Sequence, residues 1–322
     1  MRTPDDLRAT AEAASAGLEL APPTVTDEAG VLQAEAPARS QWTLIRRRFL
    51  KHRLAVVAGI LLLILALLAI FADQVAPYDL DAPLTADILS QQLQPPSASH
   101  WFGTDELGRD QLTRILHAGR ISLFTAIAVA LAASLFGTTM GALAGYFGGW
   151  IDQLLMRMTD LVLVLPVLAV LLIASKAMGH TMGATIIVLA ALFWMPVARV
   201  VRGLFLSLKR TEFAEAAIAS GATAGWVMFR HLLPSAIGPI LVDTTLNVGN
   251  AILVESTLSF LGFGIQPPQV SWGNMLGQST SAVGTVNAYL IWFPGLAILL
   301  TVLCVNFLGD GLRDALDPTS RH

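Results

Sequence analysis

Six stretches of this sequence are long and apolar enough to cross a lipid bilayer, and this constrains the fold more than any other feature. A helix rises 1.5 Å per residue and therefore needs about 20 apolar residues to span the hydrocarbon core. The stretches are, in chain order, Leu54–Phe71, Ile121–Tyr146, Leu154–Ser175, Gly183–Val201, Ile237–Phe260 and Ala288–Leu308. The sequence predicts an all-α, polytopic membrane protein with six transmembrane helices.

Composition agrees with a membrane location and excludes several classes of function. Charged residues make up 13% of the 322 residues and the net charge is only -3, whereas a soluble domain carries about 25% charged residues. No arginine-rich or aromatic-interleaved stretch offers a surface that follows a phosphate backbone, so we expect no nucleic-acid partner. The single cysteine, Cys304, lies in an apolar stretch and is expected to be a packed thiol.

Motifs for ATP hydrolysis and metal chemistry are missing from the sequence. Lysine occurs only at positions 51, 176 and 209, and none of them completes the phosphate-binding pattern GxxxxGK[ST]. No HExxH pattern, Cys/His cluster or GxSxG elbow occurs either. We therefore expect no catalytic residue, no metal site and no cofactor bound by this chain.

The distribution of Lys and Arg predicts the orientation, because positive flanks of short loops stay in the cytoplasm. Basic residues at 46–53 precede the first stretch, and others lie between the fourth and fifth stretches and at Arg313. This places both termini in the cytoplasm, with residues 1–45 as a disordered tail and residues 311–322 as a C-terminal tail. Three arginines disagree, since they fall on the outer side: Arg109, Arg114 and Arg120.

Two segments on the outer side are longer than simple connections. Within residues 76–120, apolar Leu112, Ile115 and Leu116 fall at helical spacing after Gly108, which predicts an amphipathic helix lying on the outer membrane surface. The second segment, from Gly262 to about residue 284, is rich in Gly, Pro and Ser. Loops of this length usually carry function or contact a partner.

Glycine and proline predict how the helices pack. Gly137, Gly141, Gly145 and Gly149 recur every four residues, which allows a neighbouring helix to approach closely. Pro166 and a second proline, Pro196, remove backbone donors at membrane depth, so each should kink its helix or lie against protein that satisfies the freed carbonyl group.

The fifth stretch is the most polar and is our candidate for the translocation path. Asp243, Asn247 and Asn250 lie on one helical face, and Glu255 follows one turn or so later. A charged side chain at membrane depth is costly and usually faces a partner or a wet cavity. The alternative is that the acidic residues reach water at the two ends while the asparagines join helices by hydrogen bonds.

A cytoplasmic helix-turn-helix is predicted between the fourth and fifth stretches, within about residues 209–234. Thr211 can cap a helix over Glu212–Ser220, Gly221 can end it, and Pro234 ends a second short helix. Small side chains at Ala216 and its neighbours, with Glu215 able to pair with a cation, suit a groove on another protein.

The spacing of this loop is specific. It reads Glu215-Ala216-Ala217, three residues, Gly221, nine residues, His231, one residue, and Leu233-Pro234. This resembles the EAA loop of ATP-binding cassette (ABC) importer permeases, with His231 at a position that is usually Ile.

Further segments resemble the C-type permease subunits of dipeptide, oligopeptide and nickel importers. They are RRRFLKHR from Arg46, HWFGTDELGRDQLTRILHAGRISL from His100, ILVESTLSFLGFGIQPP from Ile252 and GDGLRDALDP from Gly309.

The resemblance implies a type I ABC importer permease fold in a bacterial inner membrane, and a set of partners. The EAA helix would dock on one of two cytoplasmic ATPase subunits, which use ATP and Mg²⁺, while a B-type permease subunit completes the path. An extracytoplasmic binding protein would deliver the substrate, with Asp105, Arg109 and Asp110 as candidate contacts for it. Peptides are the favoured cargo, and nickel or another small solute is the alternative. An ion-coupled secondary transporter, with Asp243 or Glu255 as its ion site, is the rival from another class.

Overall fold

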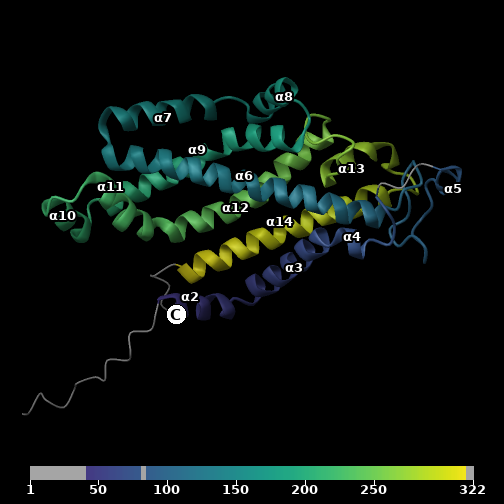
Figure 1. Cartoon of the computed structure of the whole chain (residues 1–322), viewed down its shortest axis with the longest axis horizontal. Helices are drawn as coiled ribbons and strands as arrows, with labels where there is room; N and C mark the ends of the chain where they lie inside the picture. The colour runs from purple at the N-terminus through teal and green to yellow at the C-terminus, as the bar shows by residue number, and fades with distance from the viewer. Residues whose placement is uncertain (1–40, 81–84, 317–322) are drawn as a thin grey trace, which may run out of the picture. The chain divides into compact units, whose positions relative to one another are not determined.

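A computed structural model describes residues 41–80 and 85–316, and every described regular element is helical or a short helical turn (Figure 1). The described residues from position 44 onward belong to one compact unit. The larger elements are α2 (Gln41–Lys51), α3 (Arg53–Ile70), α6 (Gln111–Phe147), α7 (Gly149–Leu163), α8 (Val167–Met178), α9 (Met182–Leu208), α10 (Glu212–Ala219), α12 (Leu233–Phe260) and α14 (Tyr289–Leu316). The shorter ones are α4 (Ala72–Val75), α5 (Ala86–Leu89), α11 (Ala224–Val227), the π-helical turn η2 (Met228–Leu232), α13 (Trp272–Gln278) and the 3₁₀ turn η3 (Thr280–Ala282).

The predicted tails lie largely outside the described residues. Helix α2 nevertheless begins at Gln41, so the last residues assigned to a disordered tail are helical. At the other end, α14 continues to Leu316, so residues 311–316 of the predicted C-terminal tail are helical. Residues 317–322 lie outside the described residues.

The all-α, multi-pass prediction is confirmed, with one span broken. In the described part of the chain, five helices are long and apolar enough to cross a membrane, and α7 and α8 form a sixth span if they are counted together. These two are bent by 90° at their junction, where Pro166 immediately precedes α8. Proline lacks the amide donor that would continue α7 and disfavours helical geometry in the residue before it. Pro196, by contrast, lies inside α9 without ending it.

Helix α6 differs from its prediction, because the segment predicted to be an amphipathic surface helix is the first part of the second span. A single helix runs for 37 residues from Gln111 to Phe147. Its first turns are packed inside the protein: Arg114, Ile115 and Ala118 are buried. The interleaved polar residues that suggested a membrane surface are thus directed at other parts of the same chain.

Helices α6 and α9 pack along each other closely, and the glycine stripe allows it. A Cβ at Gly137 would lie 2.5 Å from the carbonyl oxygen of Trp194, and one at Gly141 would lie 2.4 Å from that of Ala198. A Cβ at Gly145 would lie 2.7 Å from Phe205 Cβ. The predicted close packing is confirmed for these three positions, whereas Gly149 has nothing within 4 Å and begins α7.

We expect Gly141→Ala to destabilise the purified complex by about 1–3 kcal/mol, because the added methyl group cannot fit without moving α9. Gly203→Ala on α9 is the matched control, since nothing lies within 4 Å of its Cβ position. That change should be neutral or stabilising by less than about 1 kcal/mol. Thermal unfolding of both variants measures the difference, and equal unfolding temperatures would contradict the packing account.

The two ends of the helical bundle carry different elements (Figure 1). At one end, which we call the α10 end, α10 and α11 connect α9 to α12. At the opposite end, the α13 end, α4, α5 and α13 lie near the start of α6. The candidate functional residues therefore fall into three groups: the α10 loop, the polar face of α12, and the segments at the α13 end.

Candidate functional site

The α10 helix is a short, sharply ended element. It covers Glu212–Ala219, one residue short of the prediction, and Gly221 follows with φ +83°. The Gly221 amide donates to Ile218 O (3.0 Å) and the Ala222 amide donates to Ala217 O (3.1 Å). This pair of bonds is a Schellman motif, which a glycine in the left-handed region allows. The prediction that Gly221 ends the helix is confirmed.

One face of α10 packs on the bundle and the other is open. Ala214 is fully buried in an apolar cluster with Val227 and Phe205, and Ala217 packs against the same cluster. Glu215 and Ala216 are exposed on the other face. The structure therefore leaves the acidic residue and a small neighbour accessible. Buried Ala214 and partly buried Ala217 pack on an apolar cluster that includes residues of α6, α9 and α12.

The second half of the loop corrects the prediction for Pro234. The chain does not stop there, because α11, η2 and α12 follow one another without a break and together read as one helix from Ala224 to Phe260. Pro234 lies in the first turn of α12, a position where its missing amide donor costs little. The π-helical turn η2, which contains His231, lies directly before it.

Apolar side chains gather on the exposed surface of the α10 loop. Trp226 is 50% exposed and Phe229 is 71% exposed. Phe213 and Ile218 on α10 are also exposed, and His231 lies edge-on to Trp226, with 4.6 Å between ring centroids. Exposed apolar groups clustered at one site mark contact surfaces for proteins or membranes.

The predicted path residues on α12 do not share one environment. Asn247 is buried and its Nδ2 donates to Asp243 Oδ2 over 3.4 Å. Asp243 is half-buried and Asn250 is exposed. These three residues form a polar strip along α12 that is half-buried at Asp243, buried at Asn247 and exposed at Asn250.

Glu255 is separate from that strip, which corrects its placement on the path. Its side chain is fully buried, and Oε1 accepts a hydrogen bond from Ser259 Oγ at 2.7 Å. Ser259 Oγ in turn accepts from the Ile265 amide (3.0 Å). Longer contacts of 3.5 Å come from two further hydroxyl groups, those of Ser122 on α6 and Ser256. Glu255 is held among serines inside the subunit and lines no surface.

Asp105 at the α13 end is a structural anchor, which corrects its assignment as a contact for a binding protein. It is 5% exposed, and its Oδ1 accepts from the amides of Leu107 (2.8 Å) and Arg109 (2.9 Å). Its Oδ2 accepts from Arg109 Nε (2.8 Å) and from buried Arg114 Nη1 (2.6 Å). Arg114 Nη2 reaches Gln278 Oε1 on α13 at 2.8 Å, so one carboxylate ties the loop, α6 and α13 together.

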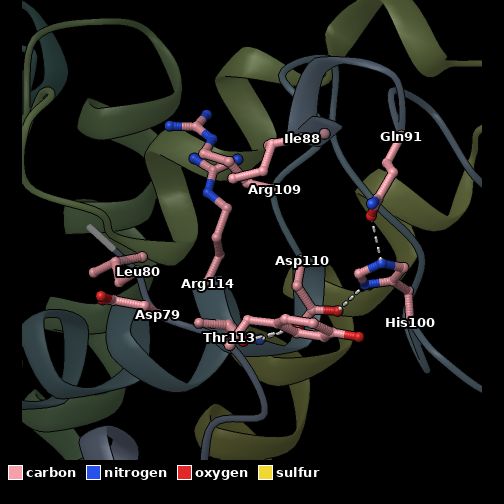
Figure 2. A pocket seen from close by; sticks show the side chains of 11 residues that line it. Asp79, Leu80, Ile88, Gln91, His100, Arg109, Asp110, Thr113 and Arg114 are labelled. Atoms are coloured by element: carbon pink, nitrogen blue, oxygen red, sulfur yellow. Dashed lines mark hydrogen bonds and ion pairs between the residues drawn. The ribbon is translucent and has the colours of Figure 1, made fainter. Parts of the chain in front are cut away.

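Asp110 is buried as well, beside a small cavity (Figure 2). It caps α6, since its Oδ2 accepts from the amide of Thr113 at 2.8 Å. Its Oδ1 lies 2.9 Å from His100 Nδ1, and His100 Nε2 lies 3.0 Å from Gln91 Oε1. Asp110 is therefore not accessible to a partner. Of the three candidate contacts, only Arg109 keeps a partly exposed side chain.

A third polar link joins α4 to α6. Asp73 accepts hydrogen bonds from Arg120 Nη2 (2.9 Å), and its other oxygen lies 3.0 Å from His117 Nε2. The hydrogen bond from Arg120, followed by that involving His117, holds the pKa of the exposed Asp73 carboxyl below its usual range. Arg120 also donates to the carbonyl oxygen of Ile70 (2.8 Å), the last residue of α3.

Sequence reasoning missed His100, Arg114 and Gln278 as members of these networks. Their partners lie up to 164 positions away in the chain, so no local pattern marks them. One signal was present for α6: Asp110 directly precedes Gln111 and fits the preference of helix starts for an acidic cap.

Together these features define a multi-pass subunit of a membrane assembly, in which an exposed helical loop joins two spanning helices. Within the described residues, no group of three or more His, Cys, Asp and Glu could hold a metal ion. The chain belongs to the family of binding-protein-dependent transport system inner membrane components, whose model matches residues 137–322. A model for the N-terminal TM domain of oligopeptide transport permease C matches residues 40–96.

Three similar proteins cover most of the chain. The glutathione transport system permease protein GsiD of Pectobacterium atrosepticum is 42% identical over 87% of this chain and 92% of its own length. The dipeptide transport system permease protein DppC of Bacillus subtilis is 41% identical over 86% and 85%. The oligopeptide transport system permease protein OppC of Mycobacterium bovis is 39% identical over 88% and 96%.

The family fixes the class of function. This chain is a non-catalytic, multi-pass inner-membrane subunit of an ABC importer. It binds no cofactor itself, and ATP is used by separate ATPase subunits. A substrate-binding protein is the other partner that membership of the family implies.

Proposed function

We propose that this subunit forms half of a translocation path for short peptides and receives the energy of ATP hydrolysis through α10. The observation that carries the proposal is the α10 loop: a fixed helix with Glu215 and Ala216 exposed, beside the apolar surface of Phe213, Ile218, Trp226 and Phe229. One α10 helix per chain suits one ATPase subunit. A B-type permease subunit would supply the second, in a heterodimer served by two ATPase subunits.

The proposed contact between α10 and an ATPase subunit also determines the orientation that we propose for the subunit in the membrane. The α10 loop has to be cytoplasmic to reach an ATPase subunit, and α2 and the start of α3 carry the basic residues of segment 46–53. Positive flanks favour the cytoplasm. We place the N-terminus and the end of α14 on that side and the α13 end outside.

The names of the similar proteins support a peptide cargo. Their names refer to glutathione, dipeptide and oligopeptide transport. All three cargoes are short peptides or peptide-like molecules with both positive and negative groups. We propose the same class for this subunit, with substrate choice made largely by the binding protein.

At the outer face, the binding protein would meet the exposed parts of residues 101–120 and 262–284. Arg109 remains a candidate contact. Trp101 is 69% exposed and Val283 is also 69% exposed, so these side chains offer apolar contact area that Asp105 and Asp110 do not.

The polar strip on α12 would line the path. We expect Asn247→Ala combined with Asn250→Ala to lower the uptake rate or to change which peptides are preferred, because two amide groups would be lost from the strip. Val248→Ala, at a partly buried position between them, serves as a control for loss of packing. Unchanged rate and preference in the double variant would remove these residues from the path.

The proposed function is tested by uptake of a labelled dipeptide into proteoliposomes that contain the purified importer. Uptake should require ATP, the binding protein and this subunit together. Dipeptide uptake that an ion gradient drives without any ATPase subunit would contradict the proposal. An importer that retains its binding protein but moves only a different solute would contradict the peptide assignment.

A further inference from the structure

The α10 half of the bundle contains a cavity of about 510 Å³ that three helices line together. Val200 comes from α9, Asp243 from α12, and Arg313 and Leu316 come from α14. Cavities that hold small molecules are about 300–1,000 Å³. Only two of the lining residues are charged, and they have opposite signs: Asp243 and Arg313.

These two charges are not neutralised by each other. No ion pair joins them in the described part of the chain, and Asp243 accepts only a long hydrogen bond from Asn247 Nδ2, at 3.4 Å. Arg313 is exposed and makes no hydrogen bond or ion pair with any described residue. The arginines of α9 differ, since Arg199 and Arg202 are paired with acidic residues of α7. An acidic side chain within a spanning helix that has no ion pair among the described residues, as Asp243 is, points to a wet path or a ligand. Arg313 lies in the last turn of α14.

We infer that this cavity binds a zwitterionic peptide by its two ends, with Asp243 receiving the α-ammonium group and Arg313 the α-carboxylate. The inference rests on the peptide cargo of the proposed function and adds the residues that recognise it. One negative and one positive group match a ligand that carries one of each. The remaining lining is apolar, so it can contact different side chains without selecting among them, while every unmodified linear peptide presents the same two ends.

The first test measures dipeptide uptake by the intact importer in proteoliposomes, with saturating binding protein and labelled alanyl-alanine. We expect Asp243→Asn and Arg313→Gln each to lower uptake at low peptide concentration by roughly tenfold, the effect of losing one charge-assisted hydrogen bond. The conservative changes Asp243→Glu and Arg313→Lys should retain most of the uptake. Size-exclusion chromatography shows whether each variant still assembles.

A second test separates ligand recognition from a structural role. A dipeptide with a benzophenone side chain is applied to the purified complex without its binding protein, and the labelled peptides are mapped. Labelling should fall on α12 and α14 and should be prevented by alanyl-alanine. N-acetyl-alanyl-alanine amide, which lacks both charges, should compete poorly, and the two neutralised variants should label poorly.

The outcomes distinguish this inference from the proposed function. Equal competition by the blocked peptide, or labelling and uptake that are unchanged in both neutralised variants, would overturn the assignment of the cavity alone. Absence of dipeptide uptake by the wild-type importer would instead overturn the peptide cargo on which the assignment rests.

Discussion

Glu215→Lys is expected to reduce ATP-driven uptake to less than about 1% of wild type, since like charges juxtaposed at an interface cost several kcal/mol. Glu215 is exposed on α10 and makes no hydrogen bond or ion pair through its side chain within the described part of the chain. Reversing its charge should therefore leave the fold of the subunit intact. The defect should lie in the contact with the ATPase subunit.

The measurement is uptake by proteoliposomes together with the amount of assembled permease pair in the membrane. Glu212→Lys is a matched control, because Glu212 is an exposed acidic residue of the same first turn. It lies outside the residues that match the EAA pattern and should cause a smaller loss. Normal transport by Glu215→Lys would count heavily against α10 as the coupling element.

Asp105→Ala is expected to have the largest effect on stability, about 3–5 kcal/mol, because removing one member of a buried ion pair leaves the other charge uncompensated. The uncompensated group is Arg114, which is 4% exposed. The same change removes the acceptor of two backbone amides in the turn before α6. The α13 end should loosen first.

Thermal unfolding of the purified complex and limited trypsin cleavage after Arg114 report this loosening. Arg109→Gln is the matched control: it removes a partly exposed ion pair with the same carboxylate, and such pairs contribute at most about 1 kcal/mol. An Asp105→Ala complex as stable and as protease-resistant as the control would show that the carboxylate is dispensable.

Much of the helical bundle could be predicted because the sequence features that specify its helices lie within short segments of the chain. Long apolar stretches specify spanning helices, and the spacing of Gly137, Gly141 and Gly145 specifies a close helix neighbour. Gly221 ends α10 through bonds within six residues. The size of the bend at Pro166 was not predictable, because sequence shows that a donor is missing but not how far the chain turns.

The α13 end was predicted least well, for a physical reason. The first turns of α6 interleave charged and apolar residues, and this pattern is the same whether the charges meet water, lipid headgroups or protein. Here Arg114 meets Asp105 and Gln278, and Trp272 Nε1 donates to Ile115 O (3.0 Å). Such distant pairings depend on the fold and cannot be read from local spacing. Glu255 was misplaced for the same reason.

The central claim, that α10 is where the ATPase subunit docks, is tested most directly by cross-linking from position 216. Cys304 is the only cysteine of the sequence and is buried, so Ala216→Cys introduces the sole accessible thiol of this subunit. A short thiol-directed cross-linker applied to membranes that contain the whole importer should join this subunit to the ATPase subunit. Loss of that product in an importer without ATPase subunits is also predicted. No product from position 216, or a product with the extracytoplasmic binding protein, would contradict the account.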